Sequence, residues 1–175
     1  LFTGLDFTLN DSISRHFIFS SRISLLRAYN KTSSEYLILT PPASFETGIK
    51  YSFTIYEKIK DPYIKFSNLI TAKKSKVPAK EDIKLPPLGY SLFNLETGFT
   101  LYAGKQPLDL TFTVNNLLNT RYRDYLDRFR YFNDAIGRNF VIRLKVPFDF
   151  SKNKMNQQLT SNRRRRIIIS KTTKQ

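Results

Sequence analysis

The chain has 175 residues, long enough for one domain with a sizeable core, and it contains no cysteine and a single histidine, His16. These counts exclude disulfides, thiolate metal sites, cysteine nucleophiles and a histidine-rich metal site. The net charge of +15 would suit a nucleic-acid or anionic-surface partner, but residues 149–175 alone hold eight lysines and arginines against one acidic residue.

Apolar residues at every second position predict β-strands along most of the chain. In the first stretch, for example, Leu5, Phe7 and Leu9 share one face. The seven stretches with this pattern span residues 1–9, 15–26, 46–55, 62–74, 90–102, 107–116 and 137–148. The fourth is the weakest, because Asn68 interrupts its apolar face. We therefore predict an all-β, antiparallel fold with seven strands in a meander.

The lengths of these strands and of their connections point to a membrane. Strands in soluble proteins average about 5–6 residues, whereas a tilted strand that crosses a bilayer needs about 9–11. The predicted strands are near the second value. Their connections alternate between short (10–14, 57–61, 103–106) and long (29–44, 75–89, 119–136). Short turns at one end and long loops at the other are typical of transmembrane β-barrels.

Periodicity alone fits a soluble barrel or sandwich with its apolar face inward as well as a membrane barrel with that face toward lipid. The charged face favours the membrane barrel, because it also carries glycines, which a crowded or water-filled lumen would accommodate. The charged residues at mid-strand positions are Arg22, Lys50, Glu96, Asp109, Arg143 and Lys145. Aromatic residues near strand ends, such as Tyr56, Tyr102 and Phe148, fit an interfacial girdle.

Seven strands cannot close a single-chain bacterial barrel, because those barrels have an even number of strands. An open sheet would also leave two unpaired edges in hydrocarbon. The first residues read as the middle of a strand and not as a signal peptide. We therefore interpret the chain as part of a larger protein.

Residues 114–148 strongly resemble the C-terminal end of TonB-dependent outer-membrane receptors. The motif residues are Asn116, Leu117, Asn119, Tyr122, Arg123, Asp124, the run from Arg128 to Phe132, Gly137, Arg138, Asn139 and Phe148. The resemblance extends more weakly back to Leu1. It implies a barrel of about 22 strands, plugged by an N-terminal domain, in the outer membrane of a Gram-negative cell.

The resemblance also implies a function and partners. Such receptors import a scarce ligand, usually an iron–siderophore complex or cobalamin, with energy from the TonB system. This chain would supply the last seven strands, without the plug domain, and would not transport by itself. Outer-membrane lipid, lipopolysaccharide and the barrel-assembly machinery are the other implied partners. No cofactor, catalytic activity or nucleic-acid partner is expected.

The family's last strand serves as an assembly signal. Here the matching residues are Phe140, Ile142, Leu144, Val146 and Phe148. The sequence departs from the family after Phe148, where residues 149–175 form a basic tail that we predict to be disordered. This tail is either a translated frameshift or read-through, or a periplasmic segment that touches anionic lipid.

The long connection 119–136 contains the candidate site. The spacing of Tyr122, Tyr125, Leu126 and Phe129 predicts a short amphipathic helix on the barrel rim. The residues that could contact a ligand are Arg121, Arg123, Arg128, Arg130 and Tyr131. Arginines suit anionic iron chelates, but the same residues would also suit rim packing and contact with lipopolysaccharide.

Two other functions remain open. A soluble β protein that binds nucleic acid or another anionic surface would fit the charge, although its aromatic residues and its Lys and Arg residues would then share a face. They lie mostly on opposite faces here. A structural barrel without import would have the same strands. The sequence does not specify the ligand.

Overall fold

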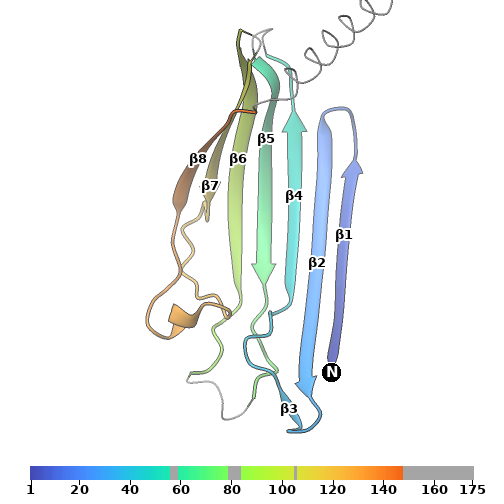
Figure 1. Cartoon of the computed structure of the whole chain (residues 1–175), viewed down its shortest axis with the longest axis vertical. Helices are drawn as coiled ribbons and strands as arrows, with labels where there is room; N and C mark the ends of the chain where they lie inside the picture. Colours follow the sequence, from blue (N-terminus) through green and yellow to red (C-terminus); the bar gives the residue numbers. More distant parts are fainter. Residues whose placement is uncertain (56–58, 79–83, 105, 148–175) are drawn as a thin grey trace, which may run out of the picture. The chain divides into compact units, whose positions relative to one another are not determined.

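The computed structural model describes residues 1–55, 59–78, 84–104 and 106–147, most of which form one antiparallel sheet (Figure 1). Seven long strands cross the sheet in the order β1-β2-β4-β5-β6-β7-β8, and the short β3 pairs only with β2. The strands are Phe2–Ser12 (β1), Phe17–Asn30 (β2), Glu35–Tyr36 (β3), Ser44–Ser52 (β4), Ile59–Thr71 (β5), Tyr90–Ala103 (β6), Gln106–Asn115 (β7) and Asn139–Lys145 (β8). The predicted all-β antiparallel meander is confirmed.

Strand β5, the weakest in the sequence, is a full strand of 13 residues. The Asn68 side chain fits into it because its amide donates to Ser91 Oγ at 2.7 Å and to the Leu92 carbonyl at 3.2 Å. The register with β6 shifts between Lys60 and Tyr63. Pro62 has no N–H to donate and therefore belongs at such a bulge.

One face of the sheet is a continuous apolar surface. The strand register aligns one residue from each of six strands in a single row: Phe19, Ile49, Phe66, Leu95, Val114 and Phe140. Ile49, Phe112 and Leu144 on this face are 48%, 38% and 61% exposed. No second layer of the described chain therefore seals it.

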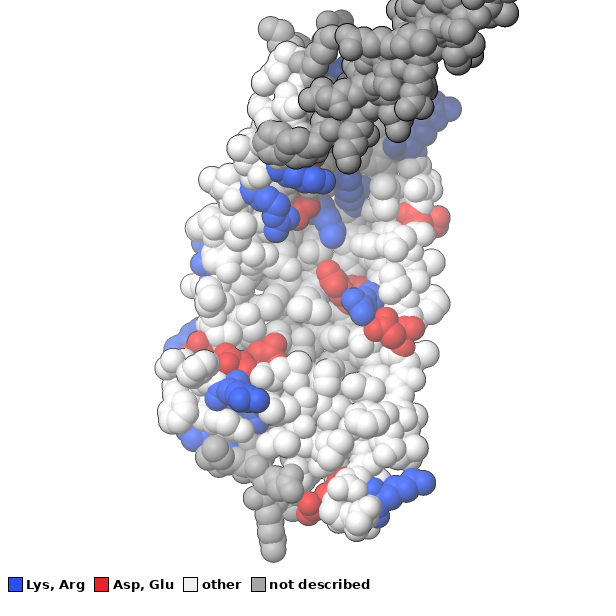
Figure 2. Space-filling view, viewed as in Figure 1, with Lys and Arg blue, Asp and Glu red and all other residues white. Residues whose placement is uncertain are grey.

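The opposite face carries the charged residues. The register places Lys50, Lys65 and Glu96 side by side, and it pairs Asp109 with Lys145. All six charged positions expected on one face share it. Figure 2 shows Lys and Arg side chains beside Asp and Glu side chains over the sheet.

On this polar face, one acidic residue forms an ion pair, and two others accept hydrogen bonds from neutral hydroxyl groups. Arg22 does bind Asp6, with Nη2 2.9 Å from Oδ2. Glu96 instead accepts a hydrogen bond from the Tyr63 hydroxyl at 2.7 Å, and Asp109 accepts one from the Thr100 hydroxyl at 2.8 Å. Neutral hydroxyl donors therefore bind the carboxylates of Glu96 and Asp109.

Gly98 makes room for Tyr63 on this face. A Cβ at Gly98 would lie 2.7 Å from Tyr63 Cε1 and 2.9 Å from its hydroxyl. The Tyr63 ring thus covers the glycine of the paired strand, and the Lys50 ammonium lies 4.1 Å from the centre of the ring. A larger residue at position 98 would displace the ring from both Lys50 and Glu96.

The two ends of the sheet differ as predicted. Few residues separate β1 from β2, β4 from β5 and β6 from β7, and the strand ends that face these connections lie at the upper end of Figure 1. More residues separate β2 from β4, β5 from β6 and β7 from β8, whose facing ends lie at the lower end, which we call the long-loop end. Loop asymmetry is therefore a property of the fold.

The sheet is open, with β1 and β8 as its two edges. The compact unit that contains it spans Leu1–Lys145. Tyr56, Phe148 and the tail 149–175 lie outside the described residues. None of the helices in the described part of the chain has the length and apolar character needed to cross a membrane.

We expect Gly98→Val to lower the free energy of unfolding by roughly 1–3 kcal/mol, because its side chain overpacks against Tyr63. Denaturant unfolding of the chain measures this. In a Tyr63→Ala background the same substitution should cost much less, because the space above position 98 is then empty. An equal cost in both backgrounds would show that the glycine is needed for another reason.

Candidate functional site

The candidate site is the connection between β7 and β8, residues 116–138, at the long-loop end. Asn116 and Asn119 begin it in the left-handed backbone region, with φ of 51° and 56°. Asparagine enters this region more readily than most residues. The Asn116 side chain closes the turn from both sides, accepting from the Thr120 N–H and donating to the Thr120 carbonyl, each at 2.8 Å. Its own N–H donates to Asn94 Oδ1 on β6 at 3.0 Å.

The motif residues that carry the family resemblance meet at the base of this loop. Asn119 Oδ1 accepts from the Arg138 N–H at 2.9 Å. A Cβ at Gly137 would lie 2.6 Å from the same oxygen, so only glycine leaves this approach open. Asn115 donates to Asn139 Oδ1 at 2.9 Å across the last pair of β7 and β8. Residues 19 and 24 positions apart in the sequence thus form one clamp, which fixes where β7 ends and β8 begins.

Aromatic packing docks the loop on the start of β6. The rings of Tyr90 and Tyr122 are 4.5 Å apart, and the Tyr90 hydroxyl donates to Asp124 Oδ2 at 3.2 Å. The Ala135 N–H donates to the Tyr122 carbonyl at 2.9 Å. Burial raises the pKa of the Tyr122 hydroxyl, and the Asp124 carboxylate raises it further. Tyr122 is therefore a neutral packing residue and does not act as a base near neutral pH.

Two of the predicted arginines share one carboxylate. Arg123 Nε lies 2.7 Å from Asp134 Oδ1, and Arg121 Nη2 lies 3.0 Å from Asp134 Oδ2. Arg123 also donates to the Arg130 carbonyl at 3.0 Å. These contacts lower the pKa of Asp134, chiefly through the hydrogen bond from Arg123 and then that from Arg121. These ion pairs join the first half of the loop, at Arg121 and Arg123, to its second half, at Asp134.

Arg130 is a structural residue in this loop. It is only 3% exposed. Its guanidinium lies 4.3 Å from the centre of the Tyr125 ring and 4.6 Å from that of Tyr131. It donates to the Tyr125 carbonyl and, at 2.8 Å, to the Tyr131 hydroxyl. A cation held between two aromatic faces stabilises the loop and is not presented to a ligand.

The predicted amphipathic helix over Tyr122–Phe129 is wrong. The loop contains only one 3₁₀ turn, Arg128–Tyr131 (η1), and Leu126 and Phe129 are exposed. The physical reason lies in two aspartates. Asp124 Oδ1 accepts from the Leu126 N–H and Asp127 Oδ1 from the Phe129 N–H, each at 2.8 Å. The first bond offers the backbone an alternative to a helix. The second caps η1, and the extended backbone of Asp127 prevents a helix from running through this position.

The structure thus brings the predicted site residues into one loop but gives them different roles. Arg121, Arg123, Arg130 and Tyr131 are held within it. Arg128 is exposed, and the Arg121 side chain stays 88% exposed beside Asp134. Arg123 is intermediate, with a side chain that is 39% exposed. Arg121 and Arg128 are thus the most accessible of the predicted arginines. No group of three His, Cys, Asp or Glu residues suited to a metal ion occurs in the described parts of the chain.

Sequence reasoning missed Asp134, which binds Arg121 and Arg123, and it assigned Tyr125 to a helix face and not to its contact with Arg130. The abundance of Arg and Tyr in the loop was visible, but the partner of each was not. Of the residues in the predicted assembly signal, Phe140, Ile142 and Leu144 lie in β8 and are exposed on the apolar face. Val146 follows the end of β8, and Phe148 lies outside the described residues.

Comparison of the chain with protein-family models, with curated proteins and with solved structures finds no match.

We expect Gly137→Ala to destabilise the loop, because the new methyl group would displace Asn119 Oδ1 from the Arg138 N–H. The cost should be about 1–3 kcal/mol, as for other overpacked sites. Hydrogen exchange at the Arg138 amide is the local readout. In an Asn119→Ala background, Gly137→Ala should have little further effect, and a fully additive cost would contradict the clamp.

Acid should loosen the loop through Asp134. Because the folded-state pKa of Asp134 is lowered, its contribution is complete above the unfolded value of about 3.9 and is lost as pH falls through the folded pKa. Limited proteolysis of the loop between pH 6 and pH 2 measures this. Asp134→Asn should give a loop that is cleaved readily at every pH, whereas the nearby control Asn133→Ala should keep the wild-type pH profile.

Proposed function

We propose that this chain forms consecutive strands in the wall of an outer-membrane β-barrel, and that the barrel is the C-terminal part of a TonB-dependent receptor that imports a scarce ligand. The ligand would be a compound such as an iron–siderophore complex or cobalamin. The single observation that carries the membrane part is the exposed apolar face of a one-layer sheet.

The energetics of that face support lipid as its environment. A soluble monomer rarely exposes a contiguous apolar patch larger than a few hundred Å². Here aligned rows of Phe, Ile and Leu cross the sheet, and each such side chain gains about 1.5–3 kcal/mol on leaving water. Several rows together would supply on the order of 10 kcal/mol or more. Contact with hydrocarbon would supply this free energy without a second layer of protein.

The dimensions and the two ends of the sheet also support the proposal. Strands β1, β2, β5, β6 and β7 have 10 to 14 residues, which suffices to cross a bilayer at a tilt. The long-loop end would face outward and the short-turn end the periplasm. The charged face would line the barrel interior, where water or a plug domain could solvate it.

The open edges support a larger barrel. The outer N–H and C=O groups of β1 and β8 would each be costly in hydrocarbon, so further strands would have to pair with them. In the proposed receptor these strands, the plug domain and the TonB system complete the transporter, and the seven strands alone would not transport. The barrel-assembly machinery would recognise the apolar alternation of β8.

The receptor part of the proposal is supported by the sequence motif and by the geometry that it forms. Asn116, Asn119, Gly137 and Asn139 carry the resemblance, and they make one clamp at the base of the longest loop. A rigid base with exposed Arg121 and Arg128 near it suits capture of an anionic ligand. The same two arginines would also suit contact with lipopolysaccharide.

Because the chain has no cysteine, single-cysteine labelling tests the membrane part. In chain refolded into phosphatidylcholine bilayers, a fluorophore at Phe66→Cys should be quenched by brominated acyl chains. Lys65→Cys, its neighbour on the other face of β5, should respond to aqueous iodide instead. A soluble, salt-sensitive complex with nucleic acid, with both labels equally open to iodide, would favour the alternative of a basic β protein.

A second measurement separates a receptor from a structural barrel. The reading frame upstream of the segment that encodes Leu1 should encode a plug domain with a TonB-contacting segment. A barrel frame without any plug would leave the membrane assignment intact but overturn the receptor assignment.

A further inference from the structure

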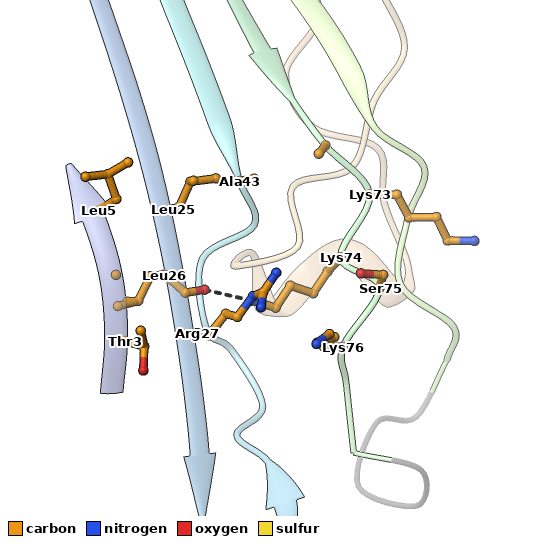
Figure 3. A pocket seen from close by; sticks show the side chains of 12 residues that line it. Thr3, Leu5, Leu25, Leu26, Arg27, Ala43, Lys73, Lys74, Ser75 and Lys76 are labelled. Carbon is orange, nitrogen blue, oxygen red and sulfur yellow. Dashed lines mark hydrogen bonds between the residues drawn. The ribbon is translucent and has the colours of Figure 1, made fainter. Parts of the chain in front are cut away.

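A pocket of about 410 Å³ lies at the long-loop end beside β1 and β2, which are at the other end of the strand order from β7 and β8 (Figure 3). Its volume is in the range of about 300–1,000 Å³ that ligand sites occupy. The residues that line it include Arg27, Lys74 and Lys76, and no described lining residue is acidic. Figure 3 shows Lys73 pointing away from the other cations.

Lys74 is held in place by the backbone. Strand β4 pairs with β2 only as far as Ser24, so the Leu26 carbonyl has no β4 partner. The Lys74 ammonium fills this gap and donates to the Leu26 carbonyl at 3.4 Å and to the Pro41 carbonyl at 3.0 Å. Burial lowers the pKa of Lys74, and the positive charge of Arg27 lowers it further. An anion between the two cations would relieve this repulsion.

The pocket belongs to the apolar face of the sheet. The register pairs Thr3 with Arg27 and Leu5 with Leu25, which puts these side chains on the same face as Phe7 and Ile23. Leu5 and Leu25 are exposed and form the wall nearest the middle of the sheet. The pocket therefore has an apolar side toward the middle of the strands and a cationic side toward their ends.

An aromatic pair lies near the pocket, at the end of β2. Tyr29 and Tyr36 pair across β2 and β3, with ring centres 5.2 Å apart. The Lys76 ammonium lies 5.3 Å from the centre of the Tyr36 ring. Tyrosines with nearby Lys or Arg are enriched where a membrane protein passes from hydrocarbon to headgroups.

We propose that this pocket binds the phosphate headgroup of an acylated lipid, with the phosphate between Arg27, Lys74 and Lys76 and an acyl chain along Leu5 and Leu25. Arginine binds phosphate oxygens through paired N–H groups, and lysine adds a point charge. A free phosphate would use the cations but leave the leucines exposed, so the apolar wall favours the lipid. This inference rests on the proposed membrane placement of the sheet.

Bromine quenching tests the proposal in the full chain folded into phosphatidylcholine bilayers. The reporter is a fluorophore at Phe7→Cys, on the same face but outside the pocket. Brominated phosphatidic acid should quench it at a lower mole fraction than brominated phosphatidylcholine. Arg27→Gln and Lys76→Gln should each raise that mole fraction about fivefold, because each basic residue near the membrane surface contributes about one such factor to anionic-lipid binding. Lys31→Gln, an exposed residue at the same end outside the pocket, should not change it.

The possible outcomes are distinct. Quenching of the Phe66→Cys label by brominated phosphatidylcholine reports insertion by itself. If that label is quenched but phosphatidic acid gains no advantage at Phe7→Cys, the lipid site is wrong and the membrane proposal stands. If inorganic phosphate displaces the brominated lipid mole for mole, the pocket takes a soluble phosphate. If Lys31→Gln acts as strongly as Arg27→Gln, only general surface charge is at work.

Discussion

Backbone hydrogen bonding between neighbouring strands is the interaction on which the rest of this structure depends. Each long strand pairs with the next along the chain, so its register fixes which side chains stand together. Because the side-chain period of a strand is two, one register sorts most of the large apolar residues to one face and most of the charges to the other. Phe66 and Lys65, adjacent in the sequence, thus belong to two different environments.

A sheet of one layer has no interior of its own, so it cannot bury many apolar side chains within the chain. Few apolar side chains are buried among the described residues: Ala28, Leu92, Val114 and Tyr125. Close local packing occurs instead around polar groups, as in Tyr63 over Gly98 and Arg130 beside two tyrosines. An environment outside the chain must cover the apolar face, and lipid is the one that the proposed function supplies.

The long-loop end carries two separate groups of cationic side chains, one in the β7–β8 loop and one in the pocket beside β1 and β2. The β7–β8 loop is tied down by its own asparagines and by Asp134, so its exposed arginines project from a fixed base. The pocket beside β1 and β2 sets cations next to leucines on the apolar face. The first arrangement suits a soluble anionic ligand from outside, and the second suits a lipid that borders the same sheet.

The sequence by itself determined the seven long strands, their antiparallel order, the two faces and the alternation of loop lengths, because each follows from local periodicity and chain length. The short β3 lies within a predicted loop and was not foreseen. The sequence also pointed to Asn119 and Gly137 as motif residues, though not to their contact. Only the tertiary structure decided the partners: Tyr63 for Glu96, Asp134 for Arg121 and Arg123, and the β2 backbone for Lys74. The predicted helix failed for the same reason. Spacing records which residues are apolar, whereas the side-chain bonds of Asp124 and Asp127 to the backbone determine whether a helix can form.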